Sequence, residues 1–167
     1  RLSTGVLFMV TLDGSTAGSQ PIVLHASFDN GLSWSPYVTT GINDATSGAT
    51  GTNLTNVVNV VVDDLDRLHF HWASHYYPSF FKNYYRSFDP VFGTMSPIVD
   101  VKAINGVAVS VRTTASQIAI TSDNRIWLTA CSPSNWREEL FVSSVAYAAT
   151  GAFTTVGILS AAASSQN

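Results

Sequence analysis

Carboxylate and imidazole side chains cluster between residues 63 and 75, where the chain could bind a metal ion. The cluster consists of Asp63, Asp64, Asp66, His69, His71 and His75. Successive side chains of a β-strand point to opposite faces, so His69 and His71 would share a face and could supply half of a zinc site. A hairpin turn followed by one polar strand face explains the same pattern without a metal. We favour that interpretation, and we predict no metal ligand and no cofactor.

A dense group of aromatic side chains lies within residues 75–86, HYYPSFFKNYYR. Aromatic rings stack on the C–H faces of sugars and anchor protein interfaces, and Tyr suits positions where one edge of the ring is wet. Core packing accounts for several of these residues, including Phe81 and Tyr85. We predict that four others contact a glycan or a protein partner, namely Tyr76, Tyr77, Phe80 and Tyr84.

Residues 27–34, SFDNGLSW, fit the pattern S-x-D-x-G-x-[ST]-W at every defined position. In such a turn the Ser hydroxyl and the Asp carboxylate can hydrogen-bond turn amides, Gly supplies a positive φ, and Trp packs beneath as an apolar plug. The segment resembles the Asp box of BNR-repeat proteins. In those families the box lies between the third and fourth strands of a β-propeller blade, away from the catalytic centre. The resemblance implies a structural role for Ser27, Asp29, Gly31, Ser33 and Trp34.

Weaker copies of the box occur later in the chain. The second copy keeps Ser87, Asp89 and Gly93, with two extra residues and Met95 where Trp is expected. The third keeps Gly151 and Phe153, with Val145 and Tyr147 at the expected Ser and Asp positions.

A longer repeat supports these copies. Residues 60–72 overlay residues 118–130 at a constant offset of 58, and both segments predict a strand, a polar turn, an Arg and a second strand. Residues 27–29 recur at 87–89 with an offset of 60, and residues 6–10 correspond to 67–71. The chain therefore contains about three related units.

The predicted fold is all-β, because helical periodicity is nearly absent. Short strands are expected at 5–12, 21–28, 34–40, 56–62, 67–74, 81–88, 96–101, 117–121, 125–131, 139–147 and 153–159. The resemblance implies four-stranded antiparallel blades of a partial, sialidase-like β-propeller within one segment, 1–160. Blade one would cover 4–41 and lack its first strand, blade two 56–101 and blade three 116–160, followed by a tail at 161–167. Complete propellers of this kind usually have six or more blades. We therefore expect an oligomer or part of a larger chain.

The sialidase-like resemblance also implies what an active site would need: an arginine cluster, a tyrosine nucleophile paired with a glutamate, and an aspartic acid. No arginine lies in a Phe-Arg-Ile-Pro type motif, and the only glutamates are the adjacent Glu138 and Glu139. We predict no catalytic residue in this chain and a protein that is not an enzyme. The alternative is a blade group of a larger glycoside hydrolase whose catalytic residues lie outside this chain.

The composition limits the partners. With a net charge of −3 and no basic stripe, nucleic acid is not expected to bind. No apolar run approaches the roughly 20 residues that span a bilayer, so we predict no membrane partner. Charged residues make up only 11% of the chain, and Ser, Thr, Asn and Gly cover its surface instead. This style is common in extracellular and virion β-proteins. We predict a surface-recognition or structural module, extracellular or virion-associated, such as a phage tail component or an exported bacterial protein.

Overall fold

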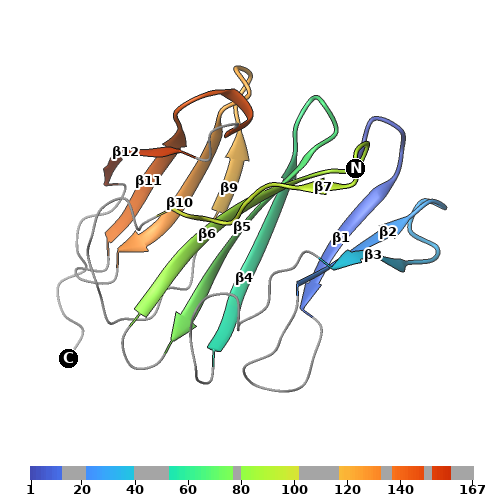
Figure 1. The fold of residues 1–167 in the computed structure, drawn as a ribbon, viewed down its shortest axis with the longest axis horizontal. Helices are drawn as coiled ribbons and strands as arrows, with labels where there is room; N and C mark the ends of the chain where they lie inside the picture. Colours follow the sequence, from blue (N-terminus) through green and yellow to red (C-terminus); the bar gives the residue numbers. More distant parts are fainter. Residues whose placement is uncertain are drawn as a thin grey trace.

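A computed structural model describes residues 1–12, 22–39, 53–76, 80–101, 117–132, 137–148 and 152–158. This part of the chain is all-β, as predicted. It forms three antiparallel sheets, which lie side by side in chain order (Figure 1). The one helical feature in the described residues is a short 3-10 turn at Ala146–Ala148.

The first sheet has the strand order β1-β2-β3. Its strands are β1 (Leu7–Leu12), β2 (Ile22–Ser27) and β3 (Ser35–Thr39). Side chains alternate along β1, so Phe8 and Val10 pack toward the second sheet whereas Met9 lies on the other face and is 39% exposed.

The second sheet has the order β4-β5-β6-β7, with β8 pairing with β6. Its strands are β4 (Asn53–Val62), β5 (Leu68–Tyr76), β6 (Phe80–Asp89), β7 (Thr94–Met95) and β8 (Val99–Asp100). The single strand predicted at 96–101 is therefore wrong. Two short segments on either side of residues 96–98 pair with β6 instead.

The third sheet places β9 (Gln117–Ile120), β10 (Ile126–Ser132), β11 (Arg137–Ser143) and β12 (Phe153–Ile158) next to one another in chain order. Strand β11 ends at Ser143, earlier than the predicted 147, because the 3-10 turn follows it. Within each sheet, strands that follow one another in sequence pair in space, except that β7 and β8 both pair with β6.

The same type of turn precedes β1 in the first sheet, β5 in the second and β10 in the third. A backbone N–H donates to a carbonyl four residues later, from Leu2 to Val6 at 2.9 Å, from Asp63 to Arg67 at 3.0 Å and from Thr121 to Arg125 at 3.1 Å. The fourth residue of each turn has a positive φ, and these residues are Gly5 (90°), Asp66 (61°) and Asn124 (59°). Gly, Asn and Asp tolerate this conformation best. The recurrence agrees with the predicted correspondence of residues 60–72 with 118–130.

The offset of 58 does not hold for the next strand of each sheet, which is β6 in the second sheet and β11 in the third. Ser87 of β6 pairs with His69, and Val142 of β11 pairs with Trp127, the counterpart of His69. Val142 therefore occupies the place that the sequence repeat gave to Val145. The connection after β11 is longer than the one after β6, and this difference restores the offset of 58 at Met95 and Phe153.

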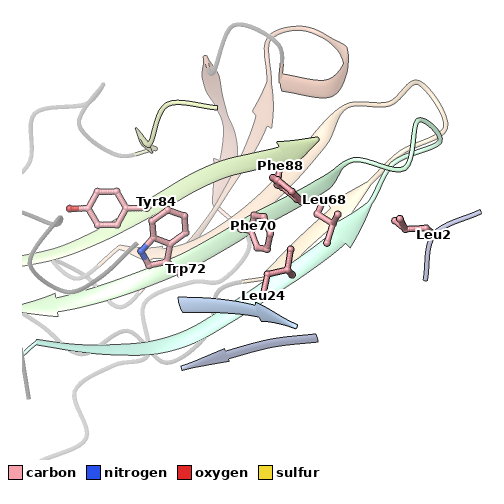
Figure 2. Close-up of a cluster of buried hydrophobic side chains, with 7 residues drawn as sticks. All are labelled: Leu2, Leu24, Leu68, Phe70, Trp72, Tyr84 and Phe88. Atoms are coloured by element: carbon pink, nitrogen blue, oxygen red, sulfur yellow. The ribbon is translucent and has the colours of Figure 1, made fainter. Parts of the chain in front are cut away.

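Two clusters of buried side chains hold the sheets together. The first, between the first and second sheets, consists of Leu2, Leu24, Leu68, Phe70, Trp72, Tyr84 and Phe88 (Figure 2). The second, between the second and third sheets, consists of Tyr85, Val101, Ile118, Ile126, Leu128, Phe141 and Phe153. Full burial of a large apolar side chain contributes about 1.5–3 kcal/mol. The second sheet is thus buried on both faces, and β5 is no more than 2% exposed from Leu68 to Trp72.

Candidate functional site

The turn between β2 and β3 is organised by one carboxylate. The Asp29 Oδ1 accepts hydrogen bonds from the Ser27 hydroxyl (2.7 Å) and the Ser33 N–H (2.9 Å), and Oδ2 accepts the Ser33 hydroxyl (2.5 Å). The Gly31 N–H donates to Ser27 Oγ at 2.8 Å. The hydrogen bonds from the Ser33 hydroxyl and N–H, and then from Ser27, lower the pKa of Asp29 to about 2. The hydrogen-bonding pattern expected of an Asp box is therefore present.

The plug role expected for Trp34 is only partly met. A Cβ at Gly31, where φ is 91°, would lie 3.9 Å from Trp34 Cζ2 and 3.6 Å from Leu7 Cδ1, so the indole does lie against the turn. However, Trp34 is 38% exposed. It lies against the turn on one side and is not enclosed.

The turn between β6 and β7 keeps part of this design. Asp89 Oδ1 accepts the N–H groups of Val91 (2.9 Å) and Phe92 (3.2 Å), and Gly93 has a φ of 63°. The backbone of Ser87 bonds Ser96: its N–H donates to Ser96 Oγ at 2.9 Å, and its carbonyl accepts the Ser96 N–H at 2.9 Å. Asp89 and Gly93 therefore fill box positions, whereas Ser87 fixes the segment that follows β7.

The two turns form part of an open cleft between the first and second sheets, with a volume of about 190 Å³. The apolar part of its lining includes Phe8, Phe28, Tyr37, Pro90 and Val91. Phe28 is 72% exposed and Val91 is 75% exposed. The rings of Phe8 and Tyr37 meet edge to face, with centroids 5.3 Å apart, which fixes the wall of the cleft.

Among the residues that the structure describes, few polar groups face this cleft. Thr4 and Asp66 contribute to its lining along with the Tyr37 side chain. The Asp66 carboxylate already accepts the Ser3 N–H at 2.7 Å and the Ser3 hydroxyl. The cleft is thus built for contact with an apolar group, and its polar atoms can fix orientation only at the edge.

A buried series of hydrogen-bonded side chains lies behind the β4–β5 turn. Asp63 Oδ2 accepts from Arg67 Nε at 2.8 Å and lies 3.0 Å from His69 Nε2, while His69 Nδ1 lies 2.6 Å from the Tyr85 hydroxyl. Burial lowers the pKa of His69, although Asp63 partly opposes this shift, so the imidazole is neutral at pH 7. We assign its N–H to Nε2, facing the carboxylate, which leaves Nδ1 to accept the phenol.

In the described residues, this hydrogen-bonded series of side chains is the arrangement that most resembles catalytic machinery, but a substrate cannot reach it. His69 is fully buried and Tyr85 is 1% exposed. Burial also raises the pKa of Tyr85 well above its usual value, which opposes formation of a phenolate nucleophile. Burial raises the pKa of Asp63, but hydrogen bonds from His69 and Arg67 outweigh this and hold the pKa below its usual value. These hydrogen bonds connect the β4–β5 turn to strands β5 and β6.

The structure gives no support to a zinc site at His69 and His71. Both ring nitrogens of His69 lie within hydrogen-bonding distance of Asp63 or Tyr85. Within the described ranges, no group of three or more His, Cys, Asp or Glu side chains could hold a metal ion. His71 is fully buried on the same strand, and burial lowers its pKa to about 4.

The residues predicted to contact a partner have different outcomes. Tyr84 is 6% exposed and stacks on Trp72 with ring centroids 5.3 Å apart, so its place is in the core and not on a binding surface (Figure 2). Tyr76 ends β5 and Phe80 begins β6, but their side chains lie outside what the structure describes, as does Tyr77. These three remain predictions.

The residues that line the cleft were not predicted from the sequence. Phe28 and Val91 occupy undefined positions of the two box-like turns, which carry no weight in the motif. An apolar residue at the tip of a polar turn was the available signal, and Phe92, at 78% exposed, repeats it.

Comparison with protein-family models and with curated proteins found no match to this sequence. In the described part of the chain, no helix is long and apolar enough to cross a membrane.

Proposed function

We propose that this chain is a non-enzymatic recognition module that binds a partner through the cleft between its first and second sheets. The observation that carries the proposal is the exposure of Phe28 (72%) and Val91 (75%) on the rim of an apolar cleft. Exposed apolar groups gathered at a concave surface are typical of binding sites.

The partner that this cleft suits best is a protein segment with an apolar side chain. Aromatic and aliphatic groups dominate the lining, and interface cores are enriched in such groups. A glycan would need several hydrogen-bond partners for its hydroxyls, and the cleft offers few. Because only 11% of the chain is charged, the surface around the cleft also presents little electrostatic selectivity. An extracellular or virion-associated location remains part of the proposal.

The architecture within this proposal is a set of β-propeller blades similar to those of BNR-repeat proteins. Three consecutive antiparallel sheets, the recurring turn and the hydrogen-bonded Asp box all favour it. Radial packing of such sheets leaves turns exposed at the rims of neighbouring blades. The glycosidase alternative rests on the resemblance alone.

The test uses a random peptide library and a glycan array, both probed with the folded full chain. We expect enrichment of peptides with an aromatic or aliphatic anchor. The double variant Phe28→Ser with Val91→Ser should weaken their binding at least tenfold, because it removes both rim contacts.

Leu32→Ser is the matched control. Leu32 lies in the same turn as Phe28 and is 89% exposed, but it does not line the cleft. Circular dichroism must show that both variants are folded. Equal loss of binding in both variants, or no loss in the double variant, would contradict the proposal. Binding confined to the glycan array would reject the protein partner.

A further inference from the structure

Neighbouring sheets are joined by a contact that repeats along the chain. In the first pair, Ser3 donates its N–H to Asp66 Oδ1 at 2.7 Å and its hydroxyl to Oδ2. In the second pair, Asn124 Nδ2 donates to Asp64 Oδ2 at 3.1 Å. Ser3 and Asp64 are the second residues of their turns, and Asp66 and Asn124 are the fourth. The second residue of one turn therefore meets the fourth residue of the next turn in both pairs.

The apolar packing repeats in the same sense. Leu68 and Phe70 of β5 face the first sheet. Their counterparts at an offset of 58, Ile126 and Leu128 of β10, face the second sheet. Each sheet thus turns one face toward the preceding sheet and the opposite face toward the following one. Such head-to-tail contacts do not terminate by themselves.

Two faces remain at the ends of this series in the described residues. On the third sheet, the face turned away from the second carries Ala119, Trp127, Leu140, Val142 and Thr154, as the strand alternation and pairing require. Ala119 and Thr154 are exposed on this face. On the first sheet, the corresponding outward face carries Leu7, Met9 and Thr11, and Met9 is 39% exposed.

We propose that the outward face of the third sheet docks on the outward face of the first sheet of a second copy of this chain. The two surfaces stand in the same relation as the sheet faces already in contact within the chain. Thr154 takes an outward position on β12, and Ser122, the exposed second residue of the third turn, lies at the point where the repeating contact would continue. This interface is independent of the ligand cleft.

The association state of the folded full chain tests this proposal. Sedimentation velocity across micromolar concentrations should show self-association of the parent chain. Ala119→Asp should raise the dissociation constant at least tenfold, because it places a charge on the docking face. Thr154→Lys, on the same face and also exposed, provides a second test if Ala119→Asp does not fold.

Val91→Asp is the matched control, since Val91 is exposed but lies on the rim of the cleft. It should leave self-association unchanged while it disturbs peptide binding, so failure of one proposal is distinguishable from failure of the other. A parent chain that stays monomeric at all concentrations would overturn the inference. So would an oligomer that neither Ala119→Asp nor Thr154→Lys weakens.

Discussion

At the residue scale, the turn formed by residues 27–34 shows what a local motif can and cannot specify. Its hydrogen bonds join residues no more than four positions apart, so the residue types alone determine them. The burial of Trp34 depends instead on which elements cover the turn, and the sequence motif carries no information about them. The turn geometry was therefore predictable and the exposed fraction of the indole was not.

Replacement of Trp34 by Ala should lower the free energy of unfolding by about 1–2 kcal/mol. A fully buried Trp would cost about 3–5 kcal/mol, but this residue is 38% exposed. Urea denaturation gives the value directly. A loss above 4 kcal/mol would mean that the indole is enclosed in solution.

His71 should make stability depend on pH. Its pKa is about 4 in the folded chain and 6.5 in the unfolded chain, so the unfolded chain binds the extra proton between these values. Stability should therefore fall as the pH is lowered from 6.5 to 4, by about 3 kcal/mol for this group.

His71→Gln removes the titrating group while retaining a polar side chain of similar size. The unfolding free energy of the variant, measured from pH 8 to pH 4, should fall less steeply than that of the parent below pH 6.5. Above pH 7 the two profiles should run parallel. Identical slopes throughout would show that the imidazole is accessible to solvent protons in the folded chain.

At the element scale, the β4–β5 turn makes hydrogen bonds in both directions along the series of sheets. Asp66 bonds Ser3, in the turn before β1, while Asp64 bonds Asn124, in the turn before β10, and Tyr147, in the 3-10 turn. The Arg67 guanidinium also lies over the Tyr147 ring, 4.2 Å from its centroid. The sequence indicated a polar turn here, but a run of aspartates gave no sign that each would bond a different neighbour.

Tyr147→Phe should lower the melting temperature by about 2–4 °C. The variant keeps the ring beneath Arg67 but loses the hydroxyl, which donates to Asp64 Oδ1 and accepts from Asn124 Nδ2, both at 3.0 Å. Tyr147→Ala removes the ring as well and should lower the melting temperature further. Differential scanning calorimetry distinguishes these results, and a Phe variant that melts with the parent would show that the hydroxyl bonds are exchanged for water at no cost.

At the scale of the whole molecule, the all-β class followed from the β-branched and aromatic runs, the number of units followed from the repeat, and antiparallel pairing within a unit was implied by the resemblance. The alignment of the third unit failed at β11 because the connection to β12 is longer there, and a constant offset cannot detect compensating differences in length. The cleft could not be predicted, because Phe8, Phe28 and Val91 come from three separate segments that only sheet packing brings together.

The pairing of sequential strands also sets the order in which the chain can fold. The recurring turn closes through hydrogen bonds between residues four apart, whereas the Ser3–Asp66 and Asp64–Asn124 contacts join residues 63 and 60 apart. Closing a long loop costs more chain entropy than closing a short one. We therefore expect hairpins to form first and the sheets to dock afterwards, so that the contacts between sheets govern mainly how fast the chain unfolds and the turns govern how fast it folds.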